Sequence, residues 1–201
     1  MQPSQDYYDL IDSYKKLHEQ EGKFKGISLI PLVPTLMKIV KDNDCKTLLD
    51  YGCGKAIPYD KERCREVDLR NPIQELCSLE SFDLYDPAYE KYATLPDKKY
   101  DIVVCTDVLE HIAEQDLDYV LTQILSRSNK VVFLNICCKP ALKHFKEGKF
   151  KGKNVHISLF EPDWWGRKIG NIWNNFNHTK VYTVCNAKLG NQVTCIKKEK
   201  E

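Results

Sequence analysis

The segment 102–105, Ile-Val-Val-Cys, is continuously apolar and has a polar residue on either side. A strand buried on one face alternates apolar and polar residues, whereas an unbroken apolar run is typical of a parallel strand covered on both faces. Residues 130–138 form a second such segment. Between the two, apolar residues recur at helical spacing from Leu117 to Leu125, with Asp116 as the expected N-cap. This order predicts parallel strands joined by a crossover helix.

The same pattern extends over the rest of the chain. Further strands are predicted at residues 46–50, 82–85, 181–185 and 193–197, and further helices at residues 4–20, 34–41 and 163–176. Gly190-Asn191 separates the last two strands and is a hairpin signal, so we expect an antiparallel strand at the C-terminal edge. The sequence therefore predicts an α/β fold with a mostly parallel sheet.

Length and composition limit the alternatives. At 201 residues we expect one domain over 1–201, in which residues 1–42 form an N-terminal helical cover and 43–201 an α/β core with a lysine-rich loop at 139–153. A net charge of +1 argues against a polybasic nucleic-acid-binding protein. We find neither a bilayer-length apolar run nor a secretory leader, so no membrane partner is expected. The nine cysteines include no CxxC pair, which favours reduced thiols and a cytoplasmic location.

A glycine-containing turn follows the strand predicted at 46–50. Gly52-Cys53-Gly54 would let the backbone approach a ligand at the carboxyl end of that strand. The dinucleotide fingerprint needs a small residue at its sixth position, where this chain has Ile57, and Pro58 interrupts the following helix. A nicotinamide-dependent enzyme is therefore disfavoured.

Asp50 followed by Gly52-Cys53-Gly54 resembles the first motif of the class I S-adenosylmethionine-dependent methyltransferases, with Ala56 in place of the usual third glycine. Asp86, in Leu-Tyr-Asp-Pro, is similar to the family's acidic residue that holds the ribose hydroxyls, which makes residues 55–80 an insertion. Residues 100–112 resemble the family's fourth-strand region. The resemblance implies a Rossmann-like, seven-stranded sheet with helices on both faces, and S-adenosylmethionine as cofactor. It assigns cofactor binding to Asp50, Gly52, Cys53, Gly54, Asp86 and Asp107.

Two carboxylates and an imidazole follow the strand at 101–105. If a helical turn begins at Asp107, its side chain lies near those of Glu110 and His111, a ligand set that suits Mg²⁺ or Mn²⁺. With His156 as a fourth ligand, the set looks like the metal site of the plant small-RNA 2′-O-methyltransferases, with Asp107 replacing a glutamate. The segment that contains Asp107, Glu110 and His111 also resembles the ubiquinone-biosynthesis O-methyltransferases. Without a metal, His111 or His156 is the expected proton acceptor.

The predicted function is S-adenosylmethionine-dependent methyl transfer, to a hydroxyl of a small molecule or of a nucleic acid, with His111 and Glu110 as catalytic residues. A small-molecule acceptor is favoured, because the chain has little beyond the core fold, although the lysine-rich loop argues for a nucleic acid. The alternative is a non-catalytic module that binds S-adenosylmethionine or a protein partner. The loop at 139–153 has few apolar residues, which favours a mobile surface loop over a lid. His18, His144 and His178 have polar neighbours and are expected to be solvated.

Overall fold

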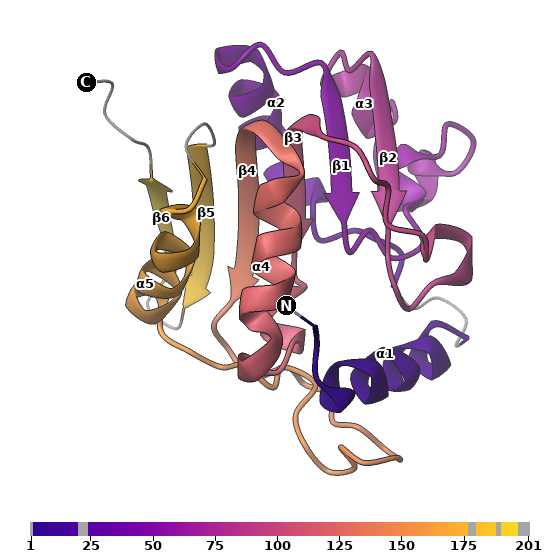
Figure 1. Cartoon of the computed structure of the whole chain (residues 1–201). Helices are drawn as coiled ribbons and strands as arrows, with labels where there is room; N and C mark the ends of the chain where they lie inside the picture. Colours follow the sequence, from indigo (N-terminus) through magenta and orange to yellow (C-terminus); the bar gives the residue numbers. More distant parts are fainter. Residues whose placement is uncertain (1, 20–23, 177–179, 188–189, 197–201) are drawn as a thin grey trace.

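A six-stranded sheet in the order β2-β1-β3-β4-β5-β6 forms the centre of the molecule (Figure 1). The computed structural model describes residues 2–19, 24–176, 180–187 and 190–196, the last seven mainly as backbone. The strands are β1 (Thr47–Tyr51), β2 (Ser81–Tyr85), β3 (Tyr100–Thr106), β4 (Ser128–Cys137), β5 (Lys180–Ala187) and β6 (Gly190–Ile196). Neighbouring strands from β2 to β5 are parallel, and β6 pairs with β5 in the antiparallel direction.

The number of strands corrects the seven implied by the resemblance, because the described residues form six. The chain passes from β2 to β3 through residues 86–99, which hold only turns and one short 3₁₀ helix, Glu90–Tyr92. A segment this short leaves no room for both a crossover helix and a further parallel strand.

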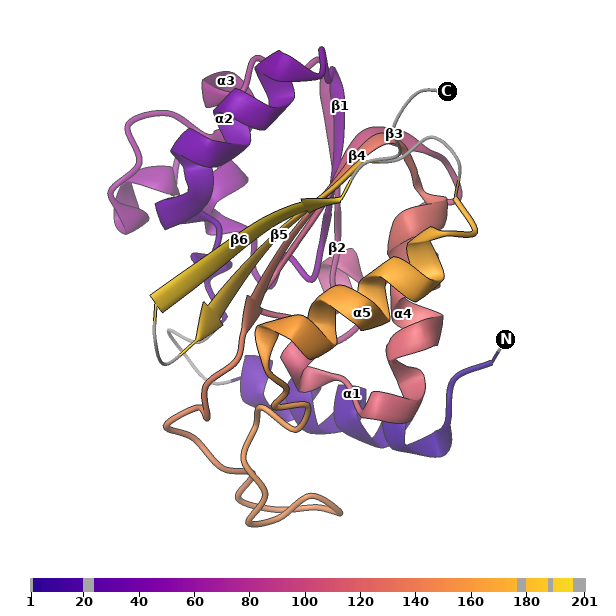
Figure 2. The same ribbon diagram turned by 90° about the vertical axis from the view of Figure 1, so that its left-hand side faces the viewer.

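Helices cover both faces of the sheet, as predicted: α2 (Val33–Asp42) and α3 (Ile73–Leu76) on one, and α4 (Leu117–Ser126) and α5 (Pro162–Trp173) on the other (Figure 2). Alternate side chains of β3 pack against the helices on opposite faces of the sheet. Val103 packs with the α4 and α5 side, whereas Ile102 and Val104 pack with Leu36 of α2. The unbroken apolar run is thus explained by burial on both faces. None of the helices in the described ranges is long and apolar enough to cross a membrane.

Helix α1 (Gln5–His18) lies across the edge of the sheet where the parallel strands end (Figure 1). Ser4 caps it, because its hydroxyl oxygen accepts a hydrogen bond from the Tyr7 backbone N–H. The Ser4 backbone N–H and hydroxyl both donate to the Asp116 carboxylate, each over 2.7 Å. Asp116 does occupy the N-cap position of α4, but its side chain makes no capping bond there. It holds the start of α1 instead.

The lysine-rich loop is anchored, which contradicts the expected mobile surface loop. Phe145 and Phe150 are buried and form a small apolar cluster with Leu10 of α1 and with Val155. Lys149 adds ion pairs to two aspartates of α1. The two phenylalanines have no periodic apolar neighbours in the sequence, so their burial depends on contacts with α1 and with other distant residues.

Candidate active site

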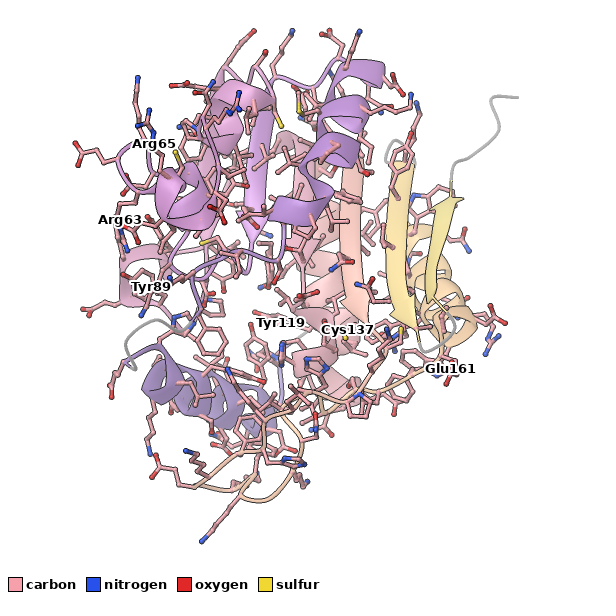
Figure 3. All side chains as sticks on the ribbon, turned by 180° about the vertical axis from the view of Figure 1, so that it is seen from behind. Arg63, Arg65, Tyr89, Tyr119, Cys137 and Glu161 are labelled. Atoms are coloured by element: carbon pink, nitrogen blue, oxygen red, sulfur yellow. The ribbon has the colours of Figure 1, made fainter. Side chains whose placement is uncertain are left out.

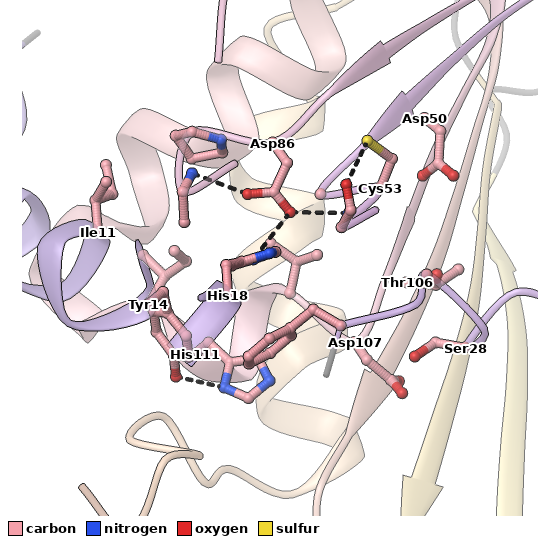
Figure 4. Close-up of a pocket in the computed structure, with 18 of the residues that line it drawn as sticks. Ile11, Tyr14, His18, Ser28, Asp50, Cys53, Asp86, Thr106, Asp107 and His111 are labelled. Carbon is pink, nitrogen blue, oxygen red and sulfur yellow. Dashed lines mark hydrogen bonds and ion pairs between the residues drawn. The ribbon is translucent and has the colours of Figure 1, made fainter. Parts of the chain in front are cut away.

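The sheet topology places a cavity of about 340 Å³ at the carboxyl ends of β1, β2 and β3 (Figure 4). Strand β1 lies between β2 and β3, so the strand order reverses there, which is where ligands bind in open α/β sheets. The residues predicted to bind the cofactor all line this cavity, and they are Asp50, Gly52, Cys53, Gly54, Asp86 and Asp107. The volume and the mixed lining are those of a small-molecule site.

The glycine turn is fastened to the end of β2. The Gly52 and Cys53 backbone N–H groups both donate to the Tyr85 carbonyl oxygen, over 2.7 and 3.1 Å. Gly52 has a φ of +87°, and a Cβ added there would overlap the side chain of Val108. At Gly54, with a φ of +58°, an added Cβ would overlap the Phe24 carbonyl oxygen. These glycines therefore serve close packing within the protein, whatever ligand they face.

Two acidic residues face the cavity from β1 and from the turn after β2. Asp50 is buried, its Oδ1 has no hydrogen-bond partner, and burial raises its pKa to about 7. The Asp86 carboxylate accepts the backbone N–H of Ala88 at Oδ1 and that of Gly54 at Oδ2, both over 2.9 Å. Burial raises the pKa of Asp86 as well. Two carboxylate oxygens offer about four acceptor sites, so the Asp86 carboxylate can still accept from a ligand.

Asp107 and Glu110 do not converge as a helical turn would require. Asp107 has a φ of +55°, so the backbone turns away at this residue, and only Leu109–His111 form a short 3₁₀ turn. The Asn135 amide donates to Asp107 Oδ1 over 2.6 Å. Glu110 is fully buried, its Oε1 accepts the Cys137 backbone N–H over 2.8 Å, and its Oε2 has no partner. Burial raises the pKa of both carboxyl groups.

The predicted four-ligand metal set is not assembled in the described part of the chain. The ligand atoms that do gather within 4.8 Å of one another belong to Glu110, His156 and a cysteine, Cys137 at the carboxyl end of β4 (Figure 3). The His156 Nδ1 lies 2.6 Å from the Lys139 carbonyl oxygen and serves as its donor. Glu110 and His156 are absent from the described lining of the cavity, which includes His111.

His111 is held by hydrogen bonds that define its tautomer. Its Nδ1 lies 2.9 Å from the Val155 carbonyl oxygen and 2.7 Å from the Tyr14 hydroxyl, which itself donates to Val155 over 2.9 Å. A carbonyl oxygen only accepts, so Nδ1 carries the proton and Nε2 carries a lone pair. Burial lowers the pKa of His111 to about 4, and the ring is therefore neutral at pH 7. The ring lines the cavity together with Tyr14 (Figure 4).

Comparison with known proteins decides the family. The family model described as a methyltransferase domain matches residues 28–180. The chain belongs to this methyltransferase family. A similar protein, the ubiquinone biosynthesis O-methyltransferase of Hydrogenovibrio crunogenus (strain DSM 25203 / XCL-2), is 27% identical over 108 residues, which is 48% of this chain and 45% of the relative. The chain thus matches less than half of that relative's length. The resemblance to class I S-adenosylmethionine-dependent methyltransferases is confirmed.

The cavity also has lining residues that sequence analysis missed. Helix α1 forms one wall of the cavity, and its lining residues there are Tyr7, Leu10, Ile11, Tyr14 and His18. His18 was expected to be solvated but is only 7% exposed. The signal was present, since His18 follows Tyr14 by four residues and so continues the buried stripe of the helix. His144 is exposed as expected, and His178 lies outside the described residues.

Proposed function

We propose that this methyltransferase methylates a hydroxyl group of a small molecule and that His111 accepts the hydroxyl proton. The observation that carries the proposal is the hydrogen-bonded His111, whose unprotonated Nε2 belongs to a residue lining the cavity. Methylation of a hydroxyl releases a proton, and a neutral imidazole within reach is the usual group to receive it. The ring stays neutral because burial lowers the pKa of His111 to about 4.

The cofactor is proposed to bind along the strand ends. S-adenosylmethionine supplies the methyl group from its positively charged sulfonium. Asp86 would receive the ribose hydroxyls at its remaining acceptor sites, and the turn Gly52-Cys53-Gly54 would lie against the amino-acid part. Asp50 supports this placement, because a buried carboxylate oxygen without a partner suits the cofactor's amino group. Asp107 lies farther along the same cavity, on the side of His111.

The acceptor is proposed to be small because α1 forms one wall of the cavity. Ile11 and Tyr14 of α1 and Val108 and Ile112 of the turn after β3 give this part of the lining an apolar character. A flat or aliphatic hydroxyl compound fits such a wall, whereas a nucleic acid would first have to displace the helix. The similar O-methyltransferase is named for the biosynthesis of a small molecule, which supports the same class.

A metal-assisted form of this reaction is a second hypothesis. It is supported by the partnerless Oε2 of Glu110 and by the grouping of Glu110, Cys137 and His156 within 4.8 Å. These residues would hold a divalent cation, which would lower the pKa of a bound hydroxyl. The hypothesis requires turnover that EDTA abolishes and that Zn²⁺ restores, since a thiolate, an imidazole and a carboxylate together suit Zn²⁺.

The proposal is tested by methyl transfer from radiolabelled S-adenosylmethionine to a panel of phenols, catechols and aliphatic alcohols, with a short RNA as the competing acceptor. We expect a hydroxyl compound to be labelled, and we expect calorimetry to show binding of S-adenosylhomocysteine with and without EDTA. Labelling of the RNA alone would overturn the small-molecule assignment. Full turnover by His111→Gln would overturn the role of His111.

A further inference from the structure

His18 is a buried imidazole that the protein does not satisfy. Its side chain is 6% exposed, and its Nδ1 has no hydrogen-bond partner. Its Nε2 lies 3.9 Å from Oδ2 of Asp86, which is too long for a hydrogen bond. Because His18 and Asp86 both line the cavity, a ligand oxygen that bridges Nε2 and Oδ2 would supply a hydrogen bond that the protein leaves unmade.

The protein nevertheless holds the imidazole ring in place. The ring stacks on Phe24, with centroids 4.5 Å apart and planes at 21°, and on Tyr89, at 5.5 Å and 24°. Asp86 and Lys55 are the charged groups that act on it. Burial lowers the pKa of His18, so the ring is neutral and donates from one nitrogen only. Figure 4 shows it directly beside Asp86, inside the cavity.

We propose that His18 binds the ribose of the cofactor and that α1 is therefore part of the cofactor site. One ribose hydroxyl accepts the N–H of His18 Nε2 and donates its own proton to Asp86 Oδ2. Two atoms 3.9 Å apart can both lie about 2.8–2.9 Å from a single oxygen placed beside the line that joins them. The inference rests on the proposed placement of the ribose at Asp86.

The proposed contact explains why His18 lies beside Asp86, and it links the cofactor site to His111. The Gly54 and Ala88 N–H groups hold the Asp86 carboxylate without using His18, so the histidine is not needed to satisfy that carboxylate. His18 stands at the C-terminal end of α1, and Tyr14, one turn earlier, binds His111. A cofactor that engages His18 thereby stabilises the helix that orients the proton acceptor.

The test is calorimetry with S-adenosylhomocysteine and its 2′-deoxy and 3′-deoxy analogues, on the wild type, His18→Ala and His18→Gln. The matched control is His144→Ala, which removes an exposed histidine outside the cavity. We expect His18→Ala to weaken S-adenosylhomocysteine binding about tenfold, the loss of one hydrogen bond. His18→Gln, which keeps an N–H donor, should recover part of the loss, and His144→Ala should bind as the wild type does.

The deoxy analogues locate the contact. Removing the correct hydroxyl should weaken binding to the wild type about ten times more than binding to His18→Ala, because the variant has already lost the bond from His18 and keeps only the bond to Asp86. Equal losses in both proteins would overturn the contact with the ribose, as would unchanged binding by a folded His18→Ala. If the wild type itself does not bind S-adenosylhomocysteine, the proposed function fails, and this inference fails with it.

Discussion

The cavity has two sides that are built in different ways. The strand-end side, consisting of the turns at residues 50–54 and 86–88, is held by backbone groups at the ends of adjacent parallel strands. The cover side, consisting of α1 and residues 139–157, is held by side-chain contacts between distant parts of the chain, such as Tyr14 with His111 and Ser4 with Asp116. The first side is part of the sheet, whereas the second is docked onto it.

Because of this difference, we expect substitutions in the two sides to have different effects. A change in the strand-end side alters cofactor binding or the stability of the whole fold, since the turn and the sheet are continuous. A change in the cover side alters the position of His111 and of the acceptor wall while the sheet stays intact, and only His18 of this side is proposed to contact the cofactor. The following predictions, from the largest effect to the smallest, test whether the two sides are independent.

His111→Gln should lower turnover about a thousandfold, because the proton acceptor is removed. The affinity for S-adenosylhomocysteine should stay within about twofold of the wild type, since the strand-end side is unchanged. Steady-state kinetics and calorimetry provide the two readouts, with His144→Gln as the control. A large loss of S-adenosylhomocysteine affinity would mean that the two sides are not independent.

Asp86→Ala should weaken S-adenosylhomocysteine binding about a hundredfold, because a charged acceptor of the ribose hydroxyls is lost along with the bonds to Gly54 and Ala88. Asp83→Ala, which lies on β2 and outside the described lining of the cavity, is the matched control. Binding should be measured by calorimetry, and folding by circular dichroism. Unchanged affinity in a folded Asp86→Ala protein would contradict the assignment.

Gly52→Ala should reduce the free energy of unfolding by about 2 kcal/mol, since the new Cβ overlaps Val108 and the residue has a positive φ. Val108→Ala in the same background should recover part of the loss. Gly170→Ala is the control, because this residue lies within α5 and has open space around the added Cβ. This variant should be slightly more stable than the wild type. Urea unfolding provides the measurement.

The buried His111 should make stability depend on pH. Its pKa is about 4 in the folded protein and about 6.5 when unfolded, so below pH 6.5 the unfolded chain takes up the proton first and the native state loses stability. Between pH 7 and pH 5 the wild type should lose about 2 kcal/mol relative to His111→Gln. The free energy of unfolding of both proteins should be measured in urea over this pH range. Equal changes in the two proteins would show that His111 titrates at its ordinary pKa.

Ser4→Ala should have the smallest effect, a loss of about 1 kcal/mol in the stability of α1, because it removes the helix cap and one bond to Asp116. Hydrogen exchange should quicken in α1 and stay unchanged in β1 and β3. Faster exchange throughout the sheet would show that the cover and the sheet unfold as one unit.

Several features were predictable because their causes lie within a few residues. The unbroken apolar run of β3, the periodic face of α4 and the glycine turn after β1 each follow from local sequence, and all three are present. The glycine motif with Asp86 also identified the methyltransferase family. The role of Asp107 was less predictable, because the proposed helical turn required an ordinary φ, whereas the residue adopts a φ of +55° and bonds to Asn135.

The sequence by itself determined the parallel α/β core and the acidic and glycine residues at its strand ends, since burial pattern and turn chemistry act over short distances along the chain. Tertiary structure decided the cover. Asp116 binds Ser4 instead of capping its own helix, Phe145 becomes buried against α1, and His18 is enclosed beside Asp86. Each of these outcomes depends on a partner far away in the chain, and the local sequence does not identify that partner, even where helical spacing indicates burial as it does for His18.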